Sequence, residues 1–576
     1  MKQIDYIQYP NPSFVREEML LLDGDWEYYS ERKNGIIKVP FCPESVLSGI
    51  EDTGFIPTCR YKRKIKLPQY HQERVILHFG AVDYLARVYL NGHFCGQHKG
   101  GYTPFAFDIT NFLQEDNILE VQVEDFTAEN TPTGKQSHRE KSYGCFYTRT
   151  TGIWQSVWLE FVPKQRIKDF YFYPNIGKNC VNVDLSTLGA GNYSIEVFYD
   201  GEKVGESIGQ IAYRKSIEIA LSQRHLWESK QGRLYDVKMS FEKDTVYSYF
   251  GLRSVRFDGY RFLLNEESVF QRLVLDQGYY QEGVYTPKNY TRFEKDIDFA
   301  LSLGFNGIRL HQKLFDPKYL YYADKKGVMV WGEFPSWGID YSNLDVCGVF
   351  LQEWQECIHR DFNHPSIVIW CPLNEIWGDI EIPEKCCDVR FCDAVYMFTK
   401  TLDTTRPCVD VSGGYHGAKT DLYDFHCYQT AEELRTHLEK FNIEDVLDIP
   451  LLFSAEQGRR YEKGEPAQIS EFGGIAFRAN VDISTGTVNE GAVQSETDWG
   501  YGNGEEDEDA FIARYEKLIE TIKICPKLSG FCYTQLYDIE QEKNGFAFYN
   551  REPKLSQNGI RKIHQINMQQ QPIEEK

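Results

Sequence analysis

Two glutamates that directly follow apolar, β-branched runs are the residues of this chain best suited to do chemistry. Glu375 follows Asn374 in SIVIWCPLNEIWG, and Glu471 follows Ser470 in AQISEFGG. Their wide separation in the sequence fits two different strands with other elements between them. Two carboxyl groups about 5 Å apart are what a retaining glycosidase needs, one as nucleophile and the other as acid/base. The fold must therefore bring these two side chains together.

From about residue 256 onward, apolar strand-like runs alternate with helical segments. Eight such runs can be counted: VFQRLVL, FNGIRL, GVMVWGE, SIVIWCPLNE, PCVDVSG, DLYDFHCY, AQISEF and LSGFCYTQL. The helical segments include RFEKDIDFALSLG, PKYLYYADKKG and EDAFIARYEKLIETIK. A gapless alternation of this kind predicts a (β/α)8 TIM barrel, and about 320 residues suit that fold with insertions. The alternative, an open doubly wound sheet, usually carries a glycine-rich phosphate loop after its first strand, and this sequence has none.

The order of the strands gives the two glutamates a common place. Active sites of TIM barrels lie at the C-terminal ends of the strands. Glu375 ends the fourth run and Glu471 ends the seventh, and these two strands face each other across an eight-stranded barrel. We therefore expect both glutamates to converge on one glycosidic bond, one as a protonated acid and the other as an ionised nucleophile. Asn374 would hydrogen-bond the 2-hydroxyl of the sugar.

Two β-rich regions precede the barrel, as expected for a chain too long for one core. In residues 1–162, segments such as RVILHFGAV and NILEVQVEDF alternate apolar and polar side chains, and Asn91-Gly92 marks a hairpin. This pattern predicts an antiparallel β-sandwich. Residues 163–255 repeat it at smaller scale, with Asp200-Gly201 as a tight turn, and predict a second, immunoglobulin-like sandwich. Residues 256–576 would form the catalytic barrel.

Charge and composition disfavour several classes of function. The chain carries 63 Lys and Arg against 85 Asp and Glu, a formal net charge of −22, so nucleic acid and anionic membrane surfaces would be repelled. It has no apolar run of about 18 residues or more and no signal-peptide pattern at MKQIDYIQYPNPSF, so we expect no membrane span and a cytoplasmic location. Fifteen cysteines without CxxC pairs indicate reduced thiols, and Cys386, Cys387 and Cys392 match no zinc pattern.

Together these motifs resemble glycoside hydrolase family 2, which contains β-galactosidases, β-glucuronidases and β-mannosidases. NHPSIVIWCPLNEIWG is similar to the acid/base signature of the family, PAQISEFGG to its nucleophile strand, and GFNGIRLHQKLFDPKYLYYADKKGVMVWGEFPSW to its second-to-third strand block. LHFGAVDYLARVYLNG and TGIWQSVWLEF resemble its jelly-roll sugar-binding domain, and LYDVKMSF its immunoglobulin-like domain. The resemblance covers nearly the whole chain in the family's domain order, and it implies a compact three-domain member.

The resemblance also implies roles for the matching residues. Glu375 would be the general acid/base and Glu471 the nucleophile, with Arg309 orienting or ionising it, because a guanidinium lowers the pKa of a neighbouring carboxylate. The implied substrate-binding residues are Asn374, Arg309, Asp276, His311, His426, Tyr428, Trp337 and Tyr533. The rings of Trp337 and Tyr533 are candidates for stacking on the sugar. A purely structural role is the alternative for four of these residues: Arg309, His311, His426 and Trp337.

Two departures from the family pattern bear on the substrate. The stretch GEFPSWG contains Glu333 but not the histidine that helps to hold magnesium in some family β-galactosidases, so we expect no metal and no cofactor. In QEKNGFAF, Phe546 stands where the β-glucuronidases carry the lysine of an Asn-x-Lys pair, after Asn544. We therefore expect a retaining, exo-acting β-glycosidase of the β-galactosidase type acting on an oligosaccharide or glycoside.

The class of sugar, the catalytic activity and the oligomeric state stay open. A β-galacturonidase or β-glucuronidase is one alternative, and a catalytically silent carbohydrate-binding relative is another. Because enzymes of this family are often dimers or tetramers, a homo-oligomer is compatible with the resemblance.

Overall fold

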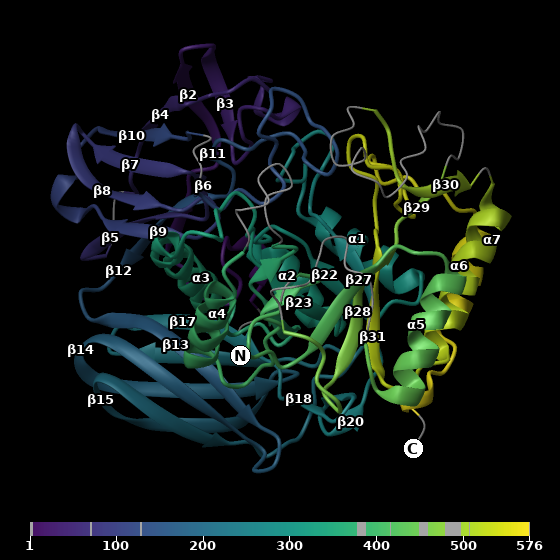
Figure 1. Cartoon of the computed structure of the whole chain (residues 1–576). Helices are drawn as coiled ribbons and strands as arrows, with labels where there is room; N and C mark the ends of the chain where they lie inside the picture. Colours follow the sequence, from purple (N-terminus) through teal and green to yellow (C-terminus); the bar gives the residue numbers. More distant parts are fainter. Residues whose placement is uncertain are drawn as a thin grey trace.

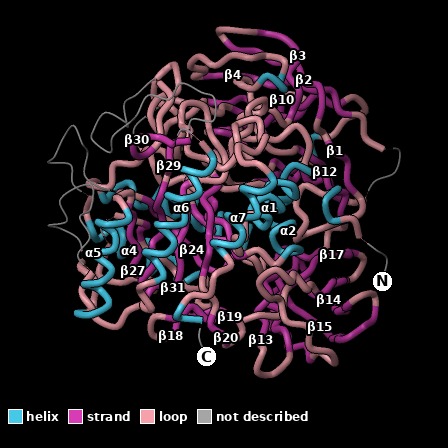
Figure 2. The backbone as a smooth tube through the Cα atoms, turned by 90° about the vertical axis from the view of Figure 1, so that its right-hand side faces the viewer, coloured by secondary structure: helices cyan, strands magenta, loops and turns pink. Residues whose placement is uncertain are grey.

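The computed structural model describes residues 4–68, 72–126, 130–376, 387–414, 416–447, 459–477, 497–505 and 507–574. Two β-sheet regions lie on one side of a barrel, the first above the second (Figure 1). In Figure 2 the helices of the barrel occupy the middle of the molecule between these two regions. None of the described helices is both long and apolar enough to cross a membrane.

The N-terminal region is a sandwich of two antiparallel sheets. Its four-stranded sheet has the order β1 (Met19–Leu21), β12 (Val157–Val162), β5 (Arg74–Phe79) and β9 (Phe105–Asp108). Its six-stranded sheet has the order β3 (Asn34–Val39), β2 (Gly24–Ser30), β4 (Thr58–Ile65), β10 (Asn117–Glu124), β7 (Leu85–Leu90) and β8 (His93–Lys99). β6 (Val82–Asp83) pairs with β11 (Gly152–Ile153). The predicted hairpin joins β7 to β8 with positive φ at Asn91 and Gly92, which confirms that turn.

The second region is a five-stranded antiparallel sheet wrapped around its own apolar core. It contains β13 (Arg166–Asn175), β14 (Cys180–Tyr199), β15 (Glu202–Ala220), β16 (Tyr235–Phe241) and β17 (Asp244–Phe250). The long strands β14 and β15 meet at Asp200-Gly201, the predicted tight turn, where both residues have positive φ. The predicted domain boundaries stay predictions; the last strand of the first sandwich ends at Val162, and the short strand β18 begins at Val255.

All eight predicted runs of the barrel contain strands. They are β21 (Gln271–Asp276), β22 (Gly307–Leu310), β23 (Met329–Glu333), β24 (Ile367–Cys371) with its continuation β25 (Leu373–Asn374), β26 (Val411–Ser412), β27 (Tyr423–Cys427), β28 (Ala467–Gly473) and β31 (Leu528–Thr534). Seven of them form a parallel sheet in the order β24-β23-β22-β21-β31-β28-β27, and β25 pairs with β26. Because β31 pairs with both β28 and β21, the last strand closes onto the first. The TIM barrel is therefore confirmed.

The described helices are α1 (Thr291–Ser302), α2 (Pro317–Lys326), α3 (Cys347–Asp361), α4 (Val389–Leu402), α5 (Ala431–Glu444), α6 (Glu508–Lys523) and α7 (Gln557–Asn567). The short 3-10 turns are η1 (Tyr6–Gln8), η2 (Val46–Ser48), η3 (Thr110–Phe112), η4 (Leu344–Val346) and η6 (Pro572–Glu574). Remaining short strands are β18 (Val255–Asp258), β19 (Arg261–Leu264), β20 (Glu267–Ser268), β29 (Ile475–Phe477) and β30 (Tyr501–Glu505). β18 and β19 lie against the inward-facing apolar residues of the barrel strands and close its N-terminal end.

The alternation of strands and helices is not gapless. In the part of 413–422 that the structure describes, no helix connects β26 to β27. This connection is short and rich in glycine, and the buried Asp410 holds it by accepting hydrogen bonds from the Gly417 N–H (2.6 Å) and pairing with His416 Nδ1 (2.7 Å). Glycine has a low helix propensity, so the polar contacts of Asp410 determine this loop.

Arg16 ties the two sandwiches together through buried ion pairs. Its guanidinium donates to Glu160 of β12 (2.7 Å), to both carboxylate oxygens of Asp244 in β17 (2.9 and 3.0 Å) and to the carbonyl oxygen of Ile167 in β13 (2.7 Å). The residue is 8% exposed. Both carboxylates therefore share the Arg16 guanidinium, and Glu160 also lies 3.4 Å from His78 Nε2.

Replacing this cation should destabilise the protein strongly. Arg16→Met removes the buried cation that Asp244 and Glu160 share, so we expect the free energy of unfolding to fall by about 3–5 kcal/mol. Differential scanning calorimetry measures the shift of the melting temperature. The matched control is Arg256→Met, which removes an exposed pair with Glu266 and should leave the melting temperature nearly unchanged. Equal shifts in the two variants would contradict the role of Arg16.

Candidate active site

Arg309 lies at the centre of a polar cluster at the C-terminal end of the barrel strands. On β22 its neighbours Ile308 and Leu310 pack with the helices outside the barrel, so Arg309 points inward. The side chain is 0% exposed. Because a buried guanidinium cannot shed its charge, its N–H groups must find acceptors inside the protein.

Those acceptors come from three other strands. Nε donates to Glu333 at the end of β23, and NH2 donates to Asn374 Oδ1 on β25 (2.6 Å). NH1 donates to Glu471 Oε1 (3.0 Å) and to the carbonyl oxygen of Ser470 (2.9 Å), both on β28. One planar group therefore fixes the positions of Asn374 and Glu471 relative to each other.

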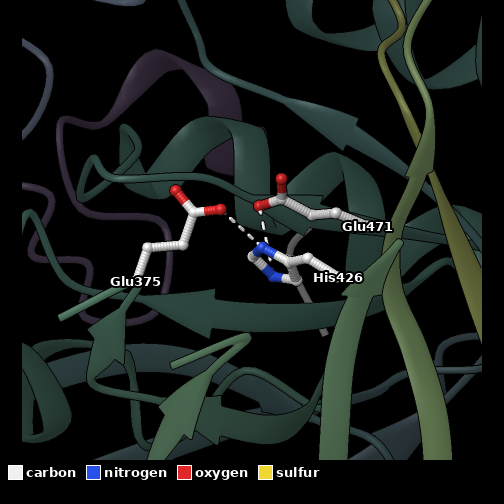
Figure 3. A group of neighbouring side chains, drawn as sticks. All are labelled: Glu375, His426 and Glu471. Atoms are coloured by element: carbon white, nitrogen blue, oxygen red, sulfur yellow. Dashed lines mark hydrogen bonds and ion pairs between the residues drawn. The ribbon is translucent and has the colours of Figure 1, made fainter. Parts of the chain in front are cut away.

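His426, on β27, lies between the two predicted catalytic glutamates (Figure 3). Its Nδ1 is 2.7 Å from Glu375 Oε1, and its Nε2 is 3.5 Å from Glu471 Oε1. One oxygen of each carboxylate and one His426 nitrogen all lie within 4.8 Å of one another. The structure thus brings Glu375 and Glu471 together, as their places in the strand order predict.

The backbone directs the two glutamates differently. Glu375 has a φ of 45°, an uncommon conformation for a residue other than glycine, and its N–H donates to the Ser412 carbonyl on β26 (2.9 Å). Its side chain is 16% exposed, whereas that of Glu471, within β28, is 6% exposed. Non-glycine residues held at positive φ cluster at functional sites. Glu375 therefore lies nearer to solvent, and Glu471 lies in the barrel wall.

Positive charge keeps Glu471 ionised. Burial by itself raises the pKa of a carboxyl group, but His426 and Arg309 outweigh it and lower the pKa of Glu471 to about 2. Burial works against the imidazolium of His426, yet Glu471 and Glu375 raise the pKa of that ring. Burial and the nearby Lys135 and Arg309 lower the pKa of His311 well below its ordinary value, so that ring stays neutral.

Tyr428 and His311 contact the same carboxylates. The Tyr428 hydroxyl donates to Glu471 Oε2, and burial together with that negative charge raises the pKa of the phenol. His311 Nδ1 lies 3.0 Å from Glu333 Oε2 and 3.9 Å from Glu471 Oε1. Tyr428 and His311, which were both predicted to bind substrate, therefore lie next to the carboxylates of Glu471 and Glu333.

Asn374 and Trp337 form one edge of the site. The half-buried Trp337 donates from its indole Nε1 to the Asn374 carbonyl oxygen (2.9 Å). Asn374 Oδ1 is used by Arg309, but Asn374 Nδ2 is buried without a hydrogen-bond partner among the described residues. A buried amide donor without an acceptor is costly, so a ligand oxygen would satisfy it.

The structure does not bring Asp276 and Tyr533 to this cluster. The carboxylate of Asp276, at the end of β21, accepts from the Gly278 N–H (2.8 Å) and from the Tyr319 hydroxyl (3.2 Å). Tyr533 is 0% exposed and packs with Tyr515 of α6 on the helix side of β31. Its neighbour Thr534 reaches the cluster instead, by hydrogen bonding to the Tyr428 hydroxyl (3.0 Å). This packing leaves the Tyr533 ring no face on which a sugar could stack.

Residues outside the sequence motifs also reach the site. Tyr501 of β30 stacks on Tyr428 with ring centroids 3.8 Å apart. Lys135, from the first sandwich, is close enough to lower the pKa of Glu471, and Glu542, from the loop after β31, acts on Lys135 in turn. Glu542 stands within QEKNG, beside the Asn544 that drew attention in the sequence. Lys135 has no comparable signal, because only the packing of the sandwich on the barrel brings it there.

The trio Glu375, His426 and Glu471 also has spacing that a metal ion could use. However, His426 Nδ1 and Glu375 are already at hydrogen-bond distance, and Arg309 donates to Glu471 from the other side. The positive charges of Arg309 and Lys135 oppose a further cation. The arrangement suits a shared proton better than a bound metal.

Family models match the first sandwich and part of the barrel. Residues 33–158 match a glycosyl hydrolase 2 galactose-binding domain-like model, and residues 289–448 match the TIM barrel domain of glycosyl hydrolases family 2. A β-galactosidase of Thermoanaerobacter pseudethanolicus is 27% identical over 432 residues, which cover 68% of this chain and 55% of that protein. A β-glucuronidase of Streptococcus agalactiae is 24% identical over 384 residues, 59% of this chain and 62% of that protein. The chain therefore spans little more than half the length of these curated relatives.

Solved structures match over almost the full chain. A β-D-glucuronidase of Dictyoglomus thermophilum has a TM-score of 0.76 at 20% identity and covers 97% of this chain and 98% of its own. A β-galacturonidase of Eisenbergiella tayi bound to galacturonate has a TM-score of 0.74 at 18% identity, covering 96% and 98%. At such identities the likeness establishes the fold.

The charge on Glu471 should make stability depend on pH. The carboxyl has an ordinary pKa of 4.5 and a folded-state pKa of about 2, so its contribution is present above about pH 4.5 and lost as the pH falls toward 2. Glu471→Gln should therefore lower the melting temperature at neutral pH, and its difference from the wild type should shrink on acidification. Calorimetry at about pH 7, 5 and 3.5 tests this. Glu520→Gln, on the exposed face of α6, is the control. A difference for Glu471→Gln that does not change with pH would contradict the ion pairing.

Proposed function

Because this chain belongs to glycoside hydrolase family 2, we propose that it is a β-glycosidase that retains the configuration of the anomeric carbon. The observation that supports this is the convergence of Glu375 and Glu471 on His426, with carboxylate oxygens within 4.8 Å. Retaining enzymes hold their two carboxyl groups about 5–5.5 Å apart, whereas inverting enzymes need about 6.5–9.5 Å to admit a water molecule. The short separation favours double displacement.

In the first step, Glu471 attacks the anomeric carbon and forms a covalent glycosyl ester. Glu375 gives its proton to the departing glycosidic oxygen, so the aglycone leaves as a neutral alcohol. In the second step, the ionised Glu375 takes a proton from water while the water oxygen attacks the same carbon and releases Glu471. Protons and charges balance over the two steps, and the configuration is inverted twice.

The surrounding contacts fit these roles. Arg309 and Tyr428 both donate to Glu471, which holds the nucleophile ionised and directed at one face of the sugar. The unused Nδ2 of Asn374 is available for the 2-hydroxyl, a contact that strengthens in the transition state. His426, between the two carboxylates, helps to keep the pair at a fixed separation. The pKa of His426 also depends on the charge of Glu375, which changes during the reaction.

We propose a neutral sugar at the non-reducing end, with β-galactosides first. The β-galactosidase among the curated relatives supports this choice, whereas the β-glucuronidase among those relatives and the uronidases among the solved structures keep a β-glucuronide or β-galacturonide as the alternative. Asn544, where the Asn-x-Lys pattern is broken, is 0% exposed and engaged by Glu542 and Gln535, so it is not free to bind a uronate. A cytoplasmic location and the oligomeric state stay predictions.

The two glutamates should fail in different ways when they are replaced. Glu471→Gln should lower kcat by roughly 10⁵–10⁶-fold and abolish trapping by a 2-deoxy-2-fluoro glycoside, seen as a mass increase of the intact protein. Glu375→Ala should slow substrates with poor leaving groups by about 10²–10⁴-fold and activated aryl glycosides much less, because the latter need no proton. Equal losses for good and poor leaving groups would rule out Glu375 as the acid.

A panel of p-nitrophenyl glycosides should identify the sugar. It contains the β-galactoside, α-L-arabinopyranoside, β-mannoside, β-glucoside, β-glucuronide and β-galacturonide. We expect the highest kcat/KM for the β-galactoside, since no free Asn-x-Lys pair is present to hold a uronate. If folded wild-type protein binds sugars but cleaves none of these compounds, the chain is instead a catalytically silent relative.

A further inference from the structure

One segment of the first sandwich, residues 130–151, enters the barrel opening. The N–H groups of Thr133 and Gly134 donate to the carbonyl oxygen of Trp337 in the loop after β23 (2.8 and 3.2 Å). Trp499 and Gln541 each donate to the carbonyl oxygen of Gly144 (2.7 Å) from the loops after β28 and β31. Three barrel loops therefore hold this segment in one position.

A glycine is required where the segment comes nearest to the barrel. Gly134 has a φ of +58°, and a Cβ there would lie 2.3 Å from the backbone carbonyl oxygen of Gln312. The chain can approach the loop after β22 this closely only without a side chain. The close approach places the next residue, Lys135, beside the catalytic cluster.

Lys135 is a mostly buried cation whose ammonium group donates no hydrogen bond to the described residues. The residue is 8% exposed, and its Nζ lies 5.2 Å from the centroid of the Trp337 ring. Burial lowers the pKa of Lys135, but Cys145, Glu542 and Glu471 outweigh this effect and raise it. Among the described residues, none offers its Nζ a hydrogen bond or an ion pair within 4.0 Å. Its ammonium group is therefore available to donate hydrogen bonds to ligand oxygens.

Glu542 supplies the complementary acceptor. It is 2% exposed, and its two oxygens accept from the Tyr147 hydroxyl and from Asn544 Nδ2 (3.0 Å). These donors fix the carboxylate but leave it acceptor capacity, since each carboxylate oxygen can accept two hydrogen bonds. Burial raises the pKa of Glu542, and Lys135 opposes that rise, which places both groups in one electrostatic environment.

We propose that Lys135 and Glu542 bind hydroxyl groups of the non-reducing sugar, as donor and acceptor, and thereby select a neutral pyranoside over the corresponding uronide. This inference rests on the proposed β-glycosidase function. A hydroxyl group accepts from the ammonium and donates to the carboxylate, so it satisfies both. A uronate carboxylate can accept only, and it would bring a further negative charge to Glu542, Glu471 and Glu375 around a single lysine.

The test compares kcat/KM for the preferred neutral glycoside and its 6-carboxyl counterpart in single variants. Lys135→Met should lower kcat/KM for the neutral glycoside by about 10–100-fold, the loss expected for a charged hydrogen bond. Glu542→Gln keeps the shape but not the charge, and it should raise the ratio of uronide to neutral kcat/KM by about tenfold or more. Lys543→Met is the matched control, because it removes a neighbouring lysine that acts on Asp538 and Lys554; its ratio should be that of the wild type.

Analogues that lack one hydroxyl group identify the contact. If Lys135 binds a particular hydroxyl, Lys135→Met should cost much less for the deoxy sugar missing that group. Circular dichroism checks folding, and Lys135→Gln replaces the methionine variant if it does not fold. Wild-type ratios in both Lys135→Met and Glu542→Gln would overturn the inference, as would a wild type that prefers the uronide. Either result would leave the β-glycosidase function intact.

If the wild type cleaves no glycoside, the proposed function fails, and binding then tests the inference alone. Calorimetric titration with free galactose and galacturonic acid should show tighter binding of the neutral sugar, lost in Lys135→Met. Equal affinity of the wild type and Lys135→Met for both sugars would overturn it.

Discussion

A buried guanidinium is the constraint on which the candidate active site depends. Arg309 cannot be neutralised at physiological pH, so each of its N–H groups must find an oxygen inside the barrel. Glu333, Asn374, Ser470 and Glu471 supply those oxygens from three strands. Leaving one buried donor unpaired costs about 1–3 kcal/mol, so the ends of these strands cannot move independently. The same contacts hold Glu471 ionised, which links the rigidity of the barrel to the proposed chemistry.

The charged groups around Arg309 come from two parts of the chain. The barrel supplies the carboxylates Glu333, Glu375 and Glu471, while one of the cations that oppose them, Lys135, comes from the first sandwich. The sandwich is therefore part of the site and not only a neighbour of it. Because Lys135 reaches the site through a segment held by three barrel loops, a change in the docking of the sandwich would alter the electrostatics at Glu471.

The direction of each side chain within its strand explains which of the predicted residues lie in the site and which do not. Arg309 is in a strand whose flanking apolar residues, Ile308 and Leu310, pack outward, so its inward direction follows from alternation. Tyr533 stands next to the inward-facing Cys532 and so faces the helices. In β28 the pairing register shifts between Ile469 and Phe472, which changes the local alternation at Glu471. No sequence pattern indicates such a shift, so direction near a bulge is decided by the neighbouring strands.

The sequence by itself determined the eight barrel strands, their order and the chemical type of the residues at their ends. These are local properties, because apolar runs and turn residues report on the chain within a few positions. Only the tertiary structure decided that Lys135 and Glu542 lie close enough to act on each other's pKa, and that Asp276 and Tyr533 contact other residues than the carboxylate cluster. The physical reason is that such contacts depend on how the sandwich packs on the barrel and on which face of a strand each residue occupies. Both depend on residues far apart in the sequence.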